Sequence, residues 1–213
     1  LTKIQYLAVF ILICLAVDSE NAEIESQNGK IKITTGTTSA CGNTVSFIAD
    51  LVPVYEEFKQ YLEIEFVPWG RTKIEDGSLV CQFGANDCWA NRLHRCVLNM
   101  LKGDQDAQVK YMACEFTRPL PAFYQGTYTC AKDAGLSLID VDYCMSTSGD
   151  SLEGLAQEAS VRPMEIINLV PWIVFNDVID SNIRNEARIR LRSLICFALA
   201  NDPSTNVTHC SIE

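Results

Sequence analysis

Residues 30–70 read KIKITTGTTSACGNTVSFIADLVPVYEEFKQYLEIEFVPWG and contain two strand patterns on either side of one helix pattern. Residues 30–35 alternate and are rich in β-branched side chains, and residues 62–67 alternate apolar residues with glutamate. Between them, apolar residues recur at the four- and three-residue intervals of one helix face: Phe47, Leu51, Val54, Phe58 and Tyr61. Because this order is a βαβ unit, we expect the two strands to be parallel neighbours.

The remainder of the chain changes character twice. Residues 81–163 show helical patterns and no convincing strand, and residues 170–175 return to a strand pattern. Asn176-Asp177 predicts a turn, with Val178-Ile179 as a possible hairpin return, and residues 183–198 carry one apolar face of a final helix. We therefore expect a disulfide-stabilised α/β fold: one domain over residues 30–213, with a helical insertion at about 81–165.

Composition narrows the classes of partner. The chain has 213 residues, with 27 acidic and 17 basic side chains and a net charge of −10. An acidic surface disfavours binding to phosphate backbones, so we expect no nucleic-acid partner. We also expect neither a cofactor nor a metal, and we expect the two histidines and the arginines between 184 and 192 to lie on the surface.

The N-terminal segment predicts export. A lysine precedes a short apolar run that ends at residue 17, and polar residues follow at once, as in a secretory signal peptide. We assign residues 1–19 to the signal and 20–29 to a polar segment. The apolar run is shorter than the roughly 20 residues of a membrane span, so we expect no span after cleavage. The predicted location is extracellular, with the endolysosomal lumen as an alternative.

The cysteine count agrees with export, since ten cysteines are abnormal in a reducing compartment. Removal of the signal leaves nine, an odd number, so at least one thiol has no intramolecular partner. We expect Cys41, which stands forty residues before the next cysteine, to be free. Four bridges would then use the other eight, in any of 105 connectivities: Cys81, Cys88, Cys96, Cys114, Cys130, Cys144, Cys196 and Cys210.

Cys41 lies where the first strand leads into the first helix. Unpaired backbone N–H groups and the helix dipole favour an anion at such a position, which lowers the pKa of a thiol. A buried or disulfide-bonded structural cysteine is the alternative on spacing alone.

Residues 81–96 read CQFGANDCWANRLHRC. They resemble the signature C-Q-H-G-x-x-E-C-x-x-N-x-x-x-x-C of the gamma-interferon-inducible lysosomal thiol reductase (GILT) family. Phe83 stands in place of the family's His and Asp87 in place of its Glu. The matching positions are Cys81, Gln82, Gly84, Cys88, Asn91 and Cys96. Zinc is the competing interpretation of clustered cysteines, but in an exported chain disulfides are favoured.

The resemblance extends over residues 30 to 210, because residues 67–70 (VPWG) and 170–172 (VPW) are also similar to the family. It implies a thioredoxin-like fold with a helical insertion, and it implies that Pro171 is a cis-proline facing the active-site loop. It also implies a nucleophile role for Cys41.

The family's C-x-x-C motif is altered in this chain, which reads Cys41-Gly42-Asn43-Thr44, and residues 36–38 replace an aromatic-aromatic-acid stretch. Reduction of a disulfide by a dithiol needs a second thiol to release the mixed disulfide. Three hypotheses stay open: a non-catalytic protein that binds extracellular or lumenal proteins, a monothiol enzyme that uses external thiol, and a reductase that recruits a distant cysteine.

Asn206-Val207-Thr208 is an N-glycosylation sequon, which agrees with export.

Overall fold

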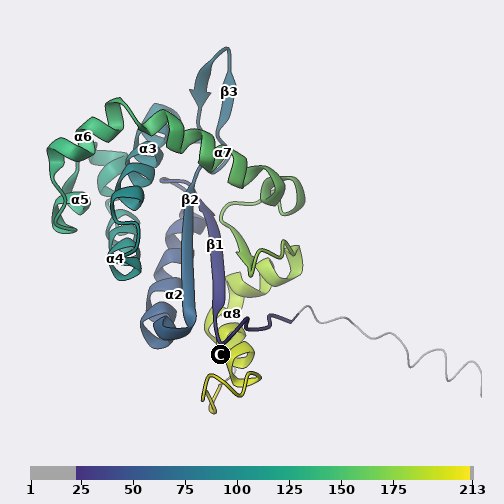
Figure 1. The fold of residues 1–213 in the computed structure, drawn as a ribbon. Helices are drawn as coiled ribbons and strands as arrows, with labels where there is room; N and C mark the ends of the chain where they lie inside the picture. The colour runs from purple at the N-terminus through teal and green to yellow at the C-terminus, as the bar shows by residue number, and fades with distance from the viewer. Residues whose placement is uncertain (1–22, 212–213) are drawn as a thin grey trace, which may run out of the picture.

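The computed structural model describes residues 23–211 and is built on a three-stranded sheet (Figure 1). The strand order is β2-β1-β5, where β1 is Ile31–Thr37, β2 is Leu62–Pro68 and β5 is Trp172–Phe175. β1 and β2 are parallel, with Ile33 opposite Ile64, so the expected βαβ pairing is confirmed. β5 is antiparallel to β1 and places Trp172 opposite Gly36.

Helix α2 (Gly42–Phe58) connects β1 to β2, followed by a short 3-10 turn, η1 (Lys59–Tyr61). The apolar face expected from the sequence is the buried face, since Phe47, Leu51, Val54 and Phe58 are all buried. These side chains pack on β1 and β2 and on the other helices of the larger of two apolar cores.

A β-hairpin that the sequence analysis did not predict follows β2. It consists of β3 (Lys73–Glu75) and β4 (Ser78–Val80), and Figure 1 shows it projecting from the body of the protein. Asp76 and Gly77 form its turn, both at positive φ, which is the Asp-Gly signal of a tight hairpin. The hairpin was missed because its strands are three residues long and mostly exposed, so they lack a buried apolar pattern.

The insertion is helical, as predicted, and six helical segments occupy residues 85–166. They are α3 (Ala85–Met100), α4 (Gln105–Glu115), the π-helical η2 (Pro121–Gln125), α5 (Thr129–Asp133), α6 (Leu138–Ser146) and α7 (Gly149–Ile166). Figure 1 shows α3 to α6 gathered on one side of the sheet, with α7 running across the molecule. The salt bridge between Arg95 of α3 and Glu153 of α7 joins these helices, and Arg95 also donates a hydrogen bond to Pro68 O at the end of β2.

The C-terminal hairpin is shorter than expected. Asn176 and Asp177 form the predicted turn, both at positive φ, but the return strand is reduced to a single bridge between Phe175 and Val178. The strand ends there because Asp180 caps α8 (Ser181–Ala200), accepting hydrogen bonds from the backbone N–H groups of Asn182 and Ile183.

A second, smaller core lies around Trp69 and Trp172, both of which are buried. Two surface expectations are wrong. His94 is buried against Tyr111 and Phe116, because α3 is covered on both sides by the insertion. Arg184 is buried because the first turn of α8 faces the loop before β5, where its guanidinium binds Pro171 O.

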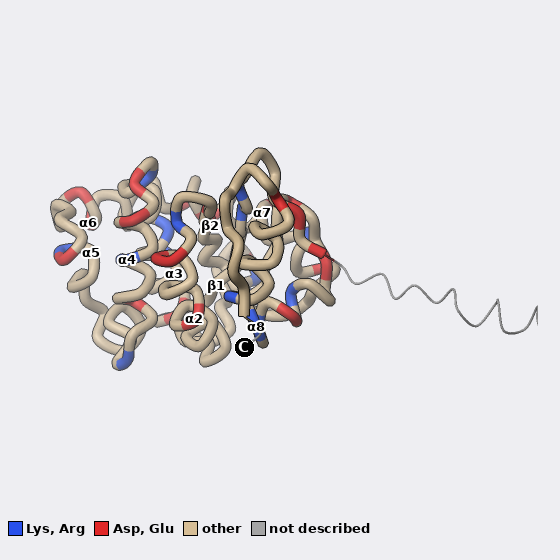
Figure 2. The backbone as a smooth tube through the Cα atoms, turned by 90° about the horizontal axis from the view of Figure 1, so that it is seen from below, with Lys and Arg blue, Asp and Glu red and all other residues tan. Residues whose placement is uncertain are grey.

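Ile24, which we assigned to a polar N-terminal segment, is buried in the larger core. The predicted signal peptide at residues 1–19 lies outside the described residues. Among residues 23–211, no helix has the length and apolarity needed to cross a membrane. Figure 2 shows acidic and basic positions spread over the elements rather than gathered on one of them.

Four disulfides join the eight cysteines expected to be bridged. The pairs are Cys81–Cys88, Cys96–Cys144, Cys114–Cys130 and Cys196–Cys210. Within residues 23–211, Cys41 is the free cysteine, as predicted, and it is buried. Three of the four bridges involve helices of the insertion, and the fourth ties the end of α8 to the C-terminal segment.

Candidate active site

The free thiol of Cys41 lies at the junction of three chain segments. Cys41 is the N-cap of α2, and its carbonyl accepts a hydrogen bond from the N–H of Val45 at 3.0 Å. Its own N–H donates to Thr38 O at 3.2 Å, which ties it to the loop after β1. On the other side, its Sγ donates to Val170 O at 3.7 Å. These contacts leave 8% of Cys41 exposed.

The proline that the family resemblance pointed to lies beside this thiol. The Val170–Pro171 peptide bond is cis, and it directly precedes β5, the strand that pairs with β1. The sheet therefore brings Cys41 and Pro171, which are 130 positions apart, to the same end of neighbouring strands. Val170 O accepts from Cys41 Sγ and Pro171 O accepts from Arg184, so this dipeptide forms one wall of the candidate site.

Arg184 is a charged group of this site that the sequence analysis missed. Its Nε and Nη2 donate to Pro171 O at 3.0 and 2.9 Å, and the side chain is buried. Burial lowers the pKa of Arg184, the neighbouring Arg188 lowers it further, and the nearby Cys41 acts in the opposite sense. No sequence pattern pointed to this position, because Arg184 falls within a group of arginines that otherwise indicates a solvated helix face.

Thr44 occupies the fourth position of the Cys41 motif and points inward. It has no exposed surface, and its hydroxyl has no hydrogen-bond partner among the described residues. It therefore does not bind the Cys41 sulfur in this structure. A second residue of the altered stretch, Gly36, is packed against the indole of Trp172, and a Cβ at position 36 would lie 2.0 Å from two atoms of that ring.

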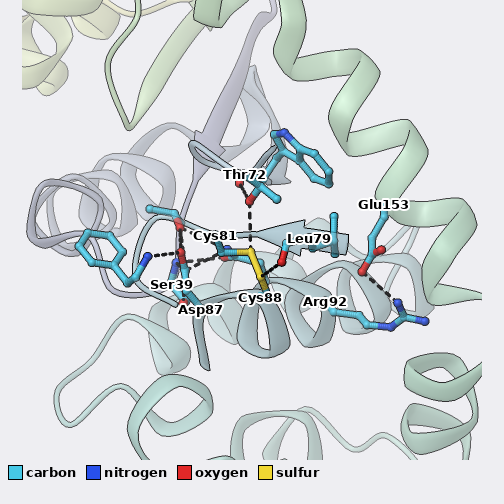
Figure 3. The surroundings of a disulfide bond; sticks show 12 residues. Ser39, Thr72, Leu79, Cys81, Asp87, Cys88, Arg92 and Glu153 are labelled. Atoms are coloured by element: carbon cyan, nitrogen blue, oxygen red, sulfur yellow. Dashed lines mark hydrogen bonds and ion pairs between the residues drawn. A yellow bond between two sulfur atoms is a disulfide. The ribbon is translucent and has the colours of Figure 1, made fainter. Parts of the chain in front are cut away.

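The signature residues 81–96 lie beside the loop that leads to Cys41 rather than at the thiol itself. Figure 3 shows the Cys81–Cys88 disulfide next to Asp87, whose carboxylate reaches Ser39. Gly84 is the N-cap of α3 at φ 81°, ψ −163°, a conformation that glycine alone adopts without strain. Cys96 binds α3 to α6 through Cys144, and Gln82 is exposed.

Asn91, like Asp87, lies on α3 and binds the loop that leads to Cys41. Its Oδ1 accepts from the Ser39 N–H at 3.0 Å, and its Nδ2 donates to Asp87 Oδ1 at 2.9 Å. From the sequence, Asn91 was a matching signature position and Asp87 only a replacement for the family's Glu. Neither Thr38 nor Ser39 was singled out, since the pairing of the loop with α3 depends on residues about fifty positions apart.

Of the other residues discussed from the sequence, Asn206 is exposed at positive φ in the segment after α8. No group of three or more His, Cys, Asp or Glu residues suited to hold a metal ion occurs within residues 23–211.

Comparisons with known proteins agree with this architecture. The protein resembles a disulfide bond oxidoreductase, DsbG, from Mycobacterium tuberculosis, solved in its reduced form, with a TM-score of 0.55, 14% identity, and coverage of 84% of this chain and 83% of that one. At this identity the likeness shows the fold, which is thioredoxin-like with a helical insertion.

Two curated relatives are similar over most of their length. GILT-like protein 1 of Drosophila melanogaster is 27% identical over 186 residues, covering 78% of this chain and 74% of that protein. A gamma-interferon-inducible lysosomal thiol reductase-like protein of Anopheles gambiae is 25% identical over 183 residues, covering 78% of this chain and 75% of that protein. The sequence model of the family described as gamma interferon inducible lysosomal thiol reductase (GILT) matches residues 32–134, which include both the Cys41 motif and the 81–96 signature. With its thioredoxin-like fold and its free cysteine beside a cis-proline, the chain belongs to the GILT family.

Proposed function

We propose that this protein is an exported GILT-like protein that binds other extracellular or lumenal proteins and does not complete a dithiol reductase cycle. The observation that supports this most is the state of the cysteines. Cys41 is the free thiol of residues 23–211, the other eight cysteines are in disulfides, and position 44 is a buried threonine.

Reduction of a disulfide by a dithiol takes two steps, and the second one requires a second thiol. In the first step a thiolate attacks the substrate disulfide, which forms a mixed disulfide and releases one substrate thiol. In the second step another thiolate must attack the mixed disulfide, which releases the second substrate thiol and leaves an oxidised pair on the enzyme. The Thr44 hydroxyl does not ionise near neutral pH as a thiol does, so Cys41 has no intramolecular partner for this step within residues 23–211.

The direct test is insulin reduction at acidic and neutral pH with the unaltered protein, Thr44→Cys and Thr44→Ser. We expect turnover near background for the unaltered protein and for Thr44→Ser, and a clear increase for Thr44→Cys. Turnover by the unaltered protein at the rate of a dithiol enzyme would contradict the proposal. An inactive Thr44→Cys variant would mean that further differences, such as Gly36 or Phe83, also suppress the reaction.

A second candidate function is monothiol exchange, favoured by the retention of Cys41 at the start of α2. In that case Cys41 forms a mixed disulfide with its target, and an external thiol releases it. Cys41→Ser separates the two functions, because it removes no disulfide and leaves the volume nearly unchanged. Binding that survives Cys41→Ser supports the non-catalytic function. A partner captured on non-reducing gels, lost with Cys41→Ser at an unchanged melting temperature, supports the monothiol function.

We further propose that the protein is secreted or resides in the endolysosomal lumen, and that Asn206 carries an N-linked glycan. The exposure of Asn206 supports this, since an acceptor must be reachable by the transferase. Expression in a secreting eukaryotic cell, followed by removal of N-glycans, should shift the mass of the unaltered protein. The Asn206→Gln variant should show no shift.

A further inference from the structure

We propose that Asp87 is a positioning residue that keeps Cys41 covered, and that the Cys81–Cys88 disulfide holds Asp87 in place, so that reducing this disulfide exposes the Cys41 thiol. The inference concerns the accessibility of Cys41. It holds whether or not Cys41 completes a redox cycle, so it can fail independently of the function proposed above.

Asp87 is the centre of a buried polar cluster between α3 and the β1–α2 loop (Figure 3). Its carboxylate has no exposed surface and accepts hydrogen bonds from five donor groups. The donors are Thr38 Oγ1 (2.7 and 2.9 Å), Ser39 N (3.1 Å), Ser39 Oγ (2.6 Å), Asn91 Nδ2 (2.9 Å) and Phe83 N (3.2 Å). A carboxylate tolerates burial only when such donors surround it. The β1–α2 loop and α3 must therefore stay in contact for Asp87 to remain buried.

Three of these donors belong to Thr38 and Ser39, which lie three and two positions before Cys41, respectively. Thr38 also accepts the N–H of Cys41 through its carbonyl oxygen. The loop is thus attached to α3 on one side and to the cysteine on the other. The Cys41 sulfur contacts Val170 O on the opposite side and the residue is only 8% exposed, so we expect movement of this loop to increase the access of a reagent to the thiol.

The disulfide controls the position of Asp87 because it closes the short loop that precedes α3. Cys88 directly follows Asp87, and Cys81 lies seven residues earlier, with the Phe83 N–H donor inside the closed loop. Asp87 itself is in the first turn of α3, and terminal turns open locally at low cost unless something holds them. Thr72, whose hydroxyl donates to Cys81 Sγ at 3.5 Å, attaches the disulfide to the segment after β2.

The redox step is ordinary thiol–disulfide exchange with an external dithiol such as dithiothreitol. One thiolate of the reagent attacks a sulfur of Cys81–Cys88 and releases the other cysteine as a thiol. The second thiol of the reagent then displaces the remaining cysteine. The reagent loses two electrons and two protons and forms its own disulfide, and Cys81 and Cys88 gain them as two thiols.

The experiment measures the rate at which iodoacetamide alkylates Cys41, read by mass spectrometry of the Cys41 peptide under native conditions without reductant. The variants are Cys81→Ala/Cys88→Ala and Asp87→Asn. The matched control is Cys196→Ala/Cys210→Ala, which removes the disulfide between the C-terminal part of α8 and the segment that follows it. We expect the rate to rise at least about tenfold in the first two, which corresponds to loss of one charge-assisted hydrogen bond, and to stay unchanged in the control.

Two further measurements separate local exposure from general instability. Low urea concentrations should leave the raised rate unchanged, because a local opening exposes little surface, whereas global unfolding would make it steeply urea-dependent. Asp87→Glu keeps the carboxylate and should stay closer to the unaltered protein than Asp87→Asn does.

If the double alanine variant does not fold, the unaltered protein is treated with limiting dithiothreitol. Molecules reduced at Cys81–Cys88 should then also be those modified at Cys41. Equal Cys41 alkylation in the unaltered protein and the folded Asp87→Asn variant would overturn the proposal. So would an equal rise in the Cys196→Ala/Cys210→Ala control, or Cys41 modification that does not follow reduction of Cys81–Cys88.

Discussion

At the scale of single residues, close contacts around the candidate site leave little room for change. The indole of Trp172 lies over Gly36 on the neighbouring strand, in a position that any side chain at residue 36 would occupy. Trp172 is in turn packed with Trp69 and Ala156 in the smaller core, directly after the cis-proline. The absence of a side chain at position 36 therefore sets how closely β5 approaches the end of β1.

Gly36→Ala is expected to destabilise the protein by about 1–3 kcal/mol, because the new Cβ would lie 2.0 Å from the Trp172 ring, which is buried and packed on its other side. Urea unfolding measures the effect. Gly154→Ala on α7 is the matched control, since its Cβ meets nothing within 4 Å and alanine favours a helix. Equal stability of the Gly36→Ala and unaltered proteins would show that Trp172 can shift.

At the scale of elements, ion pairs of Glu153 join α7 to α3. Glu153 Oε1 accepts hydrogen bonds from Arg95 Nη2 at 2.9 Å and from Arg92 Nη1 at 3.0 Å. Arg95 also lies over the ring of Trp69, with its Cζ 5.7 Å from the centroid. Desolvation lowers the pKa of Arg95 to about 10, with Glu153 opposing that effect. A buried arginine of this kind depends on its carboxylate partner.

Glu153→Ala is expected to cost about 3 kcal/mol of unfolding free energy, because it leaves the buried Arg95 without a counter-charge. Glu165→Ala removes an exposed carboxylate of the same helix, whose pair with Arg162 is solvated, and it should change stability by less than about 0.5 kcal/mol. Chemical denaturation of both variants gives the comparison. Similar losses for the two glutamates would contradict a special role for the buried pair.

At the scale of the whole molecule, cross-links compensate for a small sheet. The four disulfides close loops of very different length, from a separation of 7 for Cys81–Cys88 to 48 for Cys96–Cys144. Closing a loop restricts the unfolded chain, and the restriction grows with the logarithm of the loop length. The longer bridge is therefore expected to contribute more to global stability, while the shorter one acts on its own neighbourhood.

Replacing Cys96 and Cys144 by alanine should lower the free energy of unfolding by about 4 kcal/mol, and replacing Cys81 and Cys88 by about 2 kcal/mol, on chain entropy alone. Denaturation curves of the two double variants test the order. The opposite order would mean that contacts in the folded state outweigh the entropy of the unfolded chain.

The two ends of the described chain are joined by Asp202, which accepts hydrogen bonds from the Ser204 N–H at 2.8 Å and from the Ser26 hydroxyl. The hydrogen bonds from Ser204 and Ser26 lower the pKa of Asp202 to about 2. Because the folded-state pKa is below that of the unfolded chain, near 3.9, the stabilisation is complete above about pH 4 and is lost as the pH falls towards 2.

Asp202→Asn should consequently flatten the pH dependence of stability between about pH 4 and pH 2, and change the slope little above pH 5. Urea unfolding of both proteins at a series of pH values measures this. Asp133→Asn, on the exposed side of α5, is the charge-matched control. An unchanged slope below pH 4 in Asp202→Asn would remove Asp202 from the acid response.

Local patterns in the sequence determined the βαβ unit, the helical insertion and the final helix, because each depends on the periodicity of apolar residues. The free Cys41 followed from the odd number of cysteines and from its distance from the others. The resemblance to the family over residues 30 to 210 added the cis-proline and the thioredoxin-like fold. The hairpin at residues 73–80 escaped prediction because its strands have no buried face.

Only the tertiary structure decided what surrounds the thiol. The attachment of Ser39 to Asp87, the placement of Arg184 on Pro171 and the burial of His94 join residues that are distant in the chain. Sequence patterns report which face of an element is apolar, but whether a polar side chain becomes buried depends on its pairing with another element that covers it. That pairing exists once the chain has folded, since the partners of each polar group are supplied by other segments.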